Sequence, residues 1–471
     1  MRSSLDDAVA PADSPSKPNG FRSAIVRAAS LAGLLAGVVA LFVLLLTLAF
    51  AIPAGPVAEH VRESVPVLES EGVYPRLFID HAAFQLDNTT DSLMLDIALG
   101  EPGLGAFLSS MAMYYGVHVE ADGAFDPIDV LRTSASGQRE HREAYARYWH
   151  GYQVALRPAL YFFALDDLRR LNMLVLGSLL LLLLTLAWKR VGPEASIAVA
   201  CALVLGGFAI APLSLQYSGM TYVAVLGMLA VILLGKTGST SRGDLELFLV
   251  LGATTAFVDL LTTPLLTLGM PLGVALALRV RTVPAGGFRQ DLVFAGRAAA
   301  AWGMGYVGAW VAKWVLGSVL LGGEVTGSAV RQARMWTGGD GAVAIAVEGL
   351  KVNVMNMLPW VQFDPALTGF ARYLSIGSTG VLISIAVFVA LVLLVTCRRP
   401  SNVVKRADVV LVLVTMPYLW LATLGPHSKL HHAYTYRVQA IAVFAIVYFF
   451  AASVDWSRLR LVVRQFQRNR D

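Results

Sequence analysis

Residues 171–188 read LNMLVLGSLLLLLLTLAW and contain no charged side chain. Such a run matches the roughly 20 apolar residues that a helix needs to cross the hydrocarbon core of a bilayer. Runs of the same kind bring the prediction to about ten spans, the others lying near 25–52, 194–213, 219–235, 245–262, 264–280, 292–320, 374–397, 407–424 and 436–454. The sequence therefore predicts an all-α polytopic membrane protein with about ten transmembrane helices.

The composition of the whole chain agrees with this prediction. Of its 471 residues, 56% are hydrophobic and only 15% are charged, and the mean hydropathy is +0.63. Soluble domains carry about 25% charged residues, so a soluble enzyme is excluded. The high hydrophobicity excludes a disordered chain. With only two cysteines, Cys201 and Cys397, the chain is not a disulfide-rich secreted scaffold.

Basic residues follow alternate predicted spans, as in Lys189-Arg190, Arg279 with Arg281, and Arg398-Arg399. Lys and Arg collect on the cytoplasmic side of membrane proteins, so both termini are predicted to be cytoplasmic. The net charge of +5 is then topological, and no nucleic-acid partner is expected. The Arg- and Ala-rich composition points to a bacterial plasma membrane.

The longest stretch between predicted spans, 53–169, has 17 acidic and eight basic residues. We expect it to be an extracytoplasmic loop with interfacial helices. The predicted organisation is a disordered cytoplasmic tail (1–24), an uncleaved anchor span (25–52), this loop (53–169), spans two to seven (170–320), a second outward loop (321–373), spans eight to ten (374–454) and a basic cytoplasmic tail (455–471). Gly303, Gly305 and Gly308 in the seventh span favour close helix packing.

The large loop carries the candidate catalytic carboxylates Asp80, Asp87 and Asp91. If a helix begins at Asn88, Asp87 and Asp91 share one face and repel each other. A cation, a divalent metal or a proton held at a raised pKa would offset that repulsion, and the last case suits a general base. The alternative is structural, with Asp87 or Thr90 capping the helix and Asp91 adding to its dipole.

Further along the same loop, Arg147, His150 and Arg157 are placed to grip a phosphate or sugar hydroxyls. The aromatic residues around them, among them Tyr148 and Trp149, are typical of an anchoring belt at a membrane interface.

Ionisable residues beside spans are functional candidates. Asp259 and Lys313 lie toward the outward ends of the fifth and seventh spans. The segment 425–437 adds six candidates, namely His427, Lys429, His431, His432, Tyr436 and Arg437. The histidine spacing matches no familiar zinc site. All these groups lie at the outer membrane interface, where the sequence predicts a site that is half in water and half in lipid.

An anchor span, an outward loop with acidic residues such as Asp87-Asn88-Thr89-Thr90-Asp91, and many further spans resemble the GT-C superfamily of polytopic membrane glycosyltransferases. The resemblance implies a polyprenyl-phosphate-linked sugar donor, a glycan, lipid or protein acceptor, and a loop aspartate as general base, with Asp80-His81 as a second candidate. It further implies that His81, Asn88 and the outer-face Lys and Arg residues bind substrate. A metal at Asp87 and Asp91 is possible but not required, and membrane lipids are the other partners.

Two other classes stay open. A transporter or flippase would use Asp259, Lys313 and the histidines as a relay, although the midplane and inner halves of the spans are almost uniformly Leu, Val and Ala. A non-catalytic envelope-assembly subunit would use the loop to bind a cell-wall ligand.

Overall fold

The fold was analysed in a computed structural model. It describes residues 20–78, 80–117, 126–138, 142–235, 242–283, 287–322, 324–338, 342–357 and 406–458, and the single positions 392, 395 and 397. Most of the predicted eighth span (374–397), most of the N-terminal tail (1–24) and most of the C-terminal tail (455–471) lie outside these residues.

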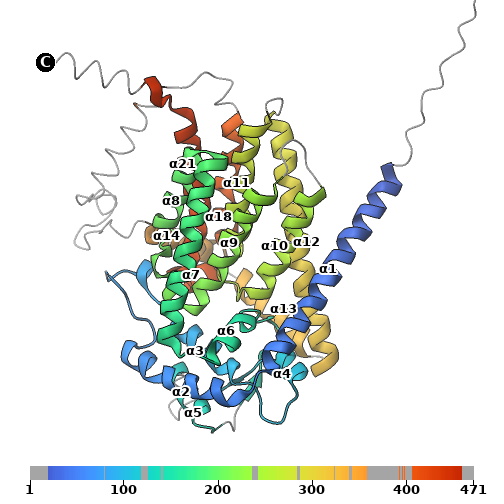
Figure 1. Cartoon of the computed structure of the whole chain (residues 1–471), viewed down its shortest axis with the longest axis vertical. Helices are drawn as coiled ribbons and strands as arrows, with labels where there is room; N and C mark the ends of the chain where they lie inside the picture. The colour runs from blue at the N-terminus through green and yellow to red at the C-terminus, as the bar shows by residue number, and fades with distance from the viewer. Residues whose placement is uncertain are drawn as a thin grey trace, which may run out of the picture.

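The described chain is almost entirely helical (Figure 1). Its first half contains α1 (Gly20–Ala51), α2 (Ala54–Glu71), η1 (Ala82–Phe84), α3 (Asn88–Ala98), α4 (Ala106–Ala112), β1 (Tyr114–Gly116), α5 (Pro127–Ala135), β2 (Arg142–Ala144), α6 (Gln153–Leu160), α7 (Leu165–Leu186), η2 (Ala187–Val191), α8 (Pro193–Leu205), η3 (Phe208–Leu213) and α9 (Leu215–Leu234). Its second half contains α10 (Arg242–Val258), α11 (Leu266–Thr282), α12 (Phe288–Leu321), α13 (Glu324–Thr337), α14 (Ala342–Asn356), η4 (Asp408–Val414), α18 (Thr415–Thr423), α19 (Gly425–Leu430), α20 (His432–Thr435), η5 (Tyr436–Gln439) and α21 (Ala440–Ser453).

Five described helical stretches are long and apolar enough to cross a membrane: Ile25–Ala51, Leu165–Val191, Leu215–Leu234, Phe288–Leu321 and His432–Ser453. They agree with the predicted all-α membrane protein. The count of about ten spans stays a prediction, because the other predicted spans are shorter helices here or lie outside the described residues.

Local sequence explains two of the shorter helices. The predicted span 194–213 divides into α8 and η3, because Gly206-Gly207 ends α8 and Gly207 has a φ of +64°. A Cβ at Gly207 would lie 1.9 Å from the Tyr436 hydroxyl, so only glycine fits. The segment 259–265 separates α10 from α11 and makes them two helices.

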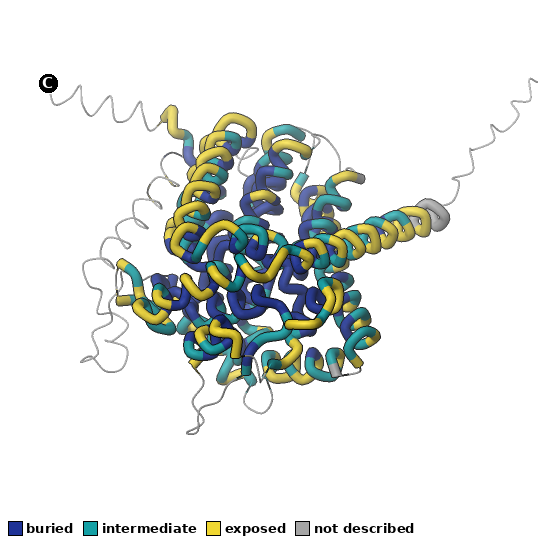
Figure 2. Tube along the Cα trace, turned by 60° about the horizontal axis from the view of Figure 1, so that its bottom comes forward, coloured by how far each residue is buried: buried dark blue, intermediate teal, exposed yellow. Residues whose placement is uncertain are grey.

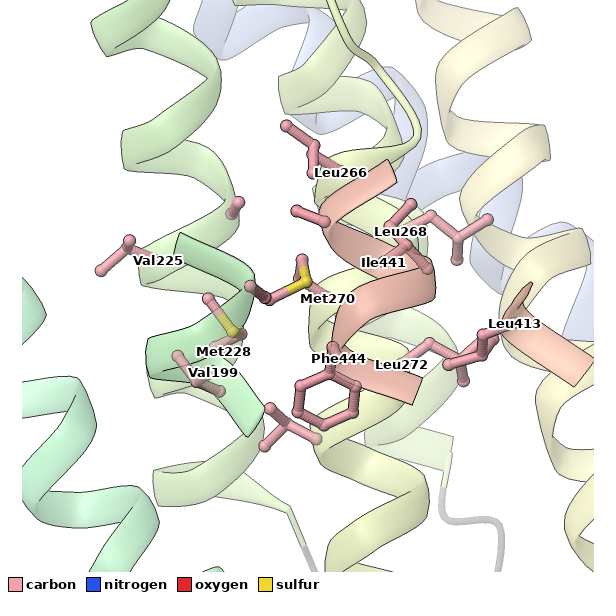
Figure 3. Packing of buried hydrophobic residues seen from close by; sticks show 14 of the residues in the cluster. Val199, Val225, Met228, Leu266, Leu268, Met270, Leu272, Leu413, Ile441 and Phe444 are labelled. Carbon is pink, nitrogen blue, oxygen red and sulfur yellow. The ribbon is translucent and has the colours of Figure 1, made fainter. Parts of the chain in front are cut away.

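The bundle is held together by apolar side chains from helices far apart in sequence. Figure 3 shows Met228 of α9 and Met270 of α11 beside Phe444 of α21. Glycines bring α10 and α12 into backbone contact, since a Cβ at Gly252 would meet the Trp302 carbonyl at 1.9 Å and one at Gly305 the Leu249 carbonyl at 2.0 Å. Close packing is thus confirmed at Gly305 and also at Gly308, where a Cβ would meet the Leu35 side chain at 2.4 Å. It is wrong for Gly303, where a Cβ would meet nothing within 4 Å.

Residues 54–164, here called the interspan domain, gather α2 to α6 at one end of the bundle (Figure 1). The domain has its own apolar core, which includes Val61, Leu95 and Leu131. Its two short strands pair antiparallel, with Tyr115 opposite Glu143. Figure 2 shows the buried chain at the centre of the molecule and α1 running outward with much of its surface exposed.

Candidate functional site

The two central loop carboxylates are both engaged in helix capping. Asp87 is the N-cap of α3 and accepts hydrogen bonds from the Thr90 N–H at 3.1 Å and from its hydroxyl at 2.8 Å. Burial raises the pKa of Asp87, although the bonds from Thr90 lower it. The helix therefore begins at Asn88 as expected, with Asp87 in the capping role of the structural alternative.

Asp91 caps a different helix. Its Oδ1 accepts from the Ser214 hydroxyl and the Gln216 N–H, and its Oδ2 accepts from the Leu215 N–H, all at 3.1 Å. These groups form the start of α9, so one carboxylate ties the interspan domain to a membrane helix. Burial raises the pKa of Asp91 to about 7, against the charge of Arg169 and the two backbone N–H groups.

The neighbouring Asn88 also connects separate elements of the fold. Its side-chain amide donates to Glu71 Oε2 at 3.0 Å and to the Gly72 carbonyl at 2.7 Å. Arg169 of α7 pairs with Glu71 at 2.6 Å. Among the described residues, no group of three His, Cys, Asp or Glu side chains is arranged to hold a metal ion.

Asp80 and His81 lie nearer the surface. Asp80 is exposed and pairs with Arg76 at 2.6 Å. The His81 ring accepts from the Ala83 N–H at 3.1 Å and so caps η1. Burial and the charge of Arg76 lower the pKa of His81.

The short helix η1 docks on the 432–439 segment. The Ala83 carbonyl accepts hydrogen bonds from the Tyr436 hydroxyl at 3.1 Å and from Arg437 Nη2 at 3.2 Å. His432 contacts Asn356 of α14 at 2.8 Å. The structure thus brings His81, His432, Tyr436 and Arg437 together. The hydrogen bonds of Tyr436 and Arg437 to Ala83 connect the interspan domain to the segment before α21.

Three other predicted residues are packed inside the protein. The ring of His150 contacts the Tyr152 hydroxyl at 2.8 Å and the Tyr145 carbonyl at 3.0 Å, and burial lowers its pKa to about 3. Arg157 donates to the Ile52 carbonyl at 3.1 Å, and burial lowers its pKa to about 10. Lys313 of α12 donates to the Met111 carbonyl at 2.8 Å.

Asp259 differs from the loop carboxylates. It follows α10 directly and is buried, and its Oδ1 accepts from the Thr262 N–H at 2.7 Å. Within the described chain its Oδ2 has no hydrogen-bond partner. Leu261, two residues on, has a φ of +67°, a strained conformation for a bulky side chain that is most often found at functional sites.

The turn at 259–263 borders a pocket of about 270 Å³, here called the aromatic pocket. Its walls come from the 145–151 segment, α12 and α13, and the described residues that define it are Arg147, Tyr148, Leu261, Tyr306, Trp310, Trp314, Gln332 and Trp336. Most of this lining is apolar. Among the described lining residues, Arg147 is the charged one.

The 145–151 segment is fixed against the membrane helices by three hydrogen bonds. Trp149 Nε1 donates to the Ala309 carbonyl at 2.8 Å, and Trp314 Nε1 donates to the Arg147 carbonyl at 3.1 Å. The Gly151 N–H donates to the Phe257 carbonyl at 2.7 Å. These bonds hold the Arg147 backbone at the rim of the aromatic pocket.

Arg147 has no ion pair with a carboxylate in the described part of the chain. Its guanidinium carbon lies 4.4 Å from the centre of the Tyr145 ring and 5.5 Å from that of Tyr148, and its Nη1 reaches the Ser328 hydroxyl at 3.4 Å. Burial raises the pKa of Tyr148, as does the nearby charge of Asp259. Asp259 therefore lies close enough for its charge to act on Tyr148, a side chain of the aromatic pocket.

The histidines of α19 and its C-terminal end lie behind Trp336. The ring centres of His427 and His431 are 4.9 and 5.4 Å from that of Trp336. Burial lowers the pKa of His427 to about 3 and that of His431 to about 4. Lys429 points elsewhere and pairs with Glu348.

The tryptophans of the aromatic pocket are a feature that our sequence analysis missed. Trp302, Tyr306, Trp310 and Trp314 recur at every fourth position, a spacing that places aromatic rings along one face of a helix. Successive ring centres along this row are 4.9, 6.3 and 5.6 Å apart. Of the predicted residues, Arg147 lines this pocket and Asp259 and His427 adjoin it.

Comparisons with protein-family models, curated proteins and solved structures find no match to this chain.

Proposed function

We propose that this protein is an integral membrane glycosyltransferase that transfers a sugar from a polyprenyl-phosphate-linked donor to a cell-envelope acceptor at the extracytoplasmic face. The observation that carries the proposal is the aromatic pocket, in which an apolar wall from α12 and α13 meets Arg147 of the interspan domain, a cation with no carboxylate partner among the described residues. Such a combination suits a ligand with an apolar chain and an anionic head.

Each part of the proposed donor has side chains in the aromatic pocket that suit its chemistry. The isoprenoid chain would lie along the apolar faces of α12 and α13, where Val307 and Val311 adjoin the tryptophans. The apolar face of the sugar would stack on an indole ring, with Gln332 available to its hydroxyls. Arg147 would hold the phosphate, since guanidinium groups form strong charge-assisted hydrogen bonds to phosphate.

Asp259 is the carboxylate best suited to act as the general base. Asp91 already accepts three hydrogen bonds and Asp87 two, whereas Asp259 Oδ2 accepts none from the residues that the structure describes. In the proposed reaction the acceptor hydroxyl attacks the anomeric carbon and gives its proton to Asp259. The bond between that carbon and the phosphate oxygen breaks, and Arg147 stabilises the charge on the departing polyprenyl phosphate.

The test is donor turnover by the full-length protein in nanodiscs, using a panel of polyprenyl-phosphate sugars. Wild type should consume one of these donors, and both Asp259→Asn and Arg147→Gln should reduce the rate. Asp167→Asn and Arg132→Gln alter exposed ion pairs and serve as matched controls. Failure of every donor in wild-type protein, or equal rates in all four variants, would refute the proposal.

A further inference from the structure

A second pocket, here called the polar pocket, lies in the interspan domain and shares Arg147 with the aromatic pocket. Its volume is about 210 Å³. The described residues that give it its polar character are Thr89, Ser92, Asp96, Tyr115, Tyr145 and Arg147. They come from α3, from the β1–β2 hairpin and from the segment that follows it.

One wall of the polar pocket is rigid. Asp96 Oδ2 accepts from the Gly116 N–H at 2.5 Å, and Oδ1 accepts from Arg142 Nη1 at 3.1 Å. Arg142 also donates to the Tyr114 carbonyl at 2.6 Å and pairs with Glu101 at 3.0 Å. Asp96 is therefore neutralised and held in place, and it serves as a fixed edge of the pocket.

Other side chains of the lining supply hydroxyl groups to the pocket. Thr89, Tyr115 and Tyr145 are only partly buried. The Ser92 hydroxyl and Arg147 Nε have no partner among the described residues, but both atoms are fully buried. Burial raises the pKa of Tyr115 and Tyr145, so both present neutral hydroxyls to the pocket.

We infer that the polar pocket binds the acceptor of the proposed transfer as a single sugar ring. Hydroxyls at Thr89 and the two tyrosines lie beside the apolar side chains Leu93, Pro127 and Val130, with one cation at the boundary. This mixture fits a sugar ring, which has both hydroxyls and an apolar face, better than a purely apolar or a highly charged molecule. The volume is below the roughly 300–1,000 Å³ typical of sites for drug-sized ligands, which favours one ring. The binding of a sugar ring does not depend on the proposed function. Only the role of that sugar as the acceptor rests on it.

The shared Arg147 gives the two pockets a common boundary. An acceptor hydroxyl that projects past Arg147 would meet the donor in the aromatic pocket, next to Tyr148 and the Asp259 turn. The new glycosidic bond then forms as the phosphate ester bond to the donor sugar breaks, with the proton going to Asp259 and the electron pair to the polyprenyl phosphate.

The first test is binding, measured by saturation-transfer NMR with a panel of methyl glycosides and the full-length protein in nanodiscs. We expect wild type to bind at least one glycoside and Thr89→Phe, which fills the pocket, to lose at least five-fold in signal. Thr133→Phe is the control, since Thr133 is a half-buried threonine of α5 that does not line the pocket. If Thr89→Phe fails to fold, Tyr115→Phe takes its place, because it removes a hydroxyl of the pocket lining and should weaken binding several-fold.

The second readout separates this inference from the proposed function. With an active donor, Thr89→Phe should lose transfer to the methyl glycoside but keep slow consumption of the donor by water. Binding without donor turnover would refute the glycosyltransferase and leave the sugar site standing. Absence of binding in wild type, or equal binding by Thr89→Phe and Thr133→Phe, would overturn the inference.

Discussion

Asp91 and Asp259 are both buried carboxylates, yet the regions around them use the charge differently. At the junction of α3 and α9, both oxygens of Asp91 accept hydrogen bonds, three in all. At the turn after α10, one oxygen of Asp259 binds the Thr262 N–H and the other has no partner in the described chain. The first region joins two parts of the fold, and the second holds a buried acceptor two residues before Leu261, which lines the aromatic pocket.

The difference shows that burial alone does not identify a catalytic carboxylate. A general base needs a lone pair that is not already used, and a helix cap has given its lone pairs to backbone N–H groups. Strain supports the same distinction, because the positive φ of Leu261 lies in the Asp259 turn. Variants of the two regions should therefore fail in different ways.

The largest effect is expected for Asp259→Asn. Loss of a general base costs about 10²–10⁴-fold in rate, so sugar transfer should fall by at least 100-fold. The unfolding midpoint should stay close to that of wild type, since the amide can still accept from Thr262. Asp167→Asn, at an exposed ion pair, is the control for removing a negative charge. An Asp259→Asn protein that transfers sugar at the wild-type rate would contradict the assignment.

A smaller effect is expected for Arg147→Gln, which removes the cation of the aromatic pocket. Hydrogen bonds to charged groups contribute about 1.5–3 kcal/mol, which corresponds to a 10- to 100-fold loss in kcat/KM for the donor. The loss should appear for donors of different sugars, because the phosphate is common to them. Arg132→Gln should leave the steady-state rate unchanged.

Asp91→Ala should affect stability more than chemistry. It leaves the Ser214 hydroxyl and two N–H groups at the start of α9 without their acceptor, and an unsatisfied buried donor costs about 1–3 kcal/mol. We expect a lower unfolding midpoint in nanodiscs, with the activity per folded molecule retained. A variant that is as stable as wild type but inactive would return Asp91 to the catalytic role.

The smallest effect is a change in how stability depends on pH. The pKa of His427 is lowered to about 3 by burial and by His431, so below its unfolded pKa of 6.5 the unfolded chain takes up a proton that the folded protein excludes. Stability conferred by neutral His427 should be complete above about pH 6.5 and decline as the pH falls toward 3. His427→Asn should flatten the decline relative to wild type, and His60→Gln on α2 should not.

A feature of the fold could be predicted from the sequence where it depends on residues that are close together along the chain. Apolar runs predicted the long helices such as α7 and α12, since spanning length is a local property. The residue before a helix predicted the capping alternative for Asp87. Gly206-Gly207 inside the third predicted span was a local signal for the end of α8. The hydropathy pattern does not register this signal and predicted one continuous span.

The candidate site depends on contacts that are distant in sequence. The acceptor role of Asp91 became evident only when α9, more than 120 residues further on, was placed beside it. Arg147 and Leu261, which lies two residues after Asp259, line one pocket because Gly151 and Trp149 fix the Arg147 segment to α10 and α12. The aromatic row from Trp302 to Trp314 was visible as a four-residue repeat, but its partner Trp336 comes from another helix.

The most direct test of the central claim is binding of a polyprenyl monophosphate that carries no sugar, followed by tryptophan fluorescence of the protein in nanodiscs. We predict a saturable change, because Trp310, Trp314 and Trp336 line the proposed site. Arg147→Gln should raise Kd at least ten-fold and Arg132→Gln should leave it unchanged. A change that does not saturate, or the same Kd in both variants, would contradict a lipid-phosphate site at Arg147.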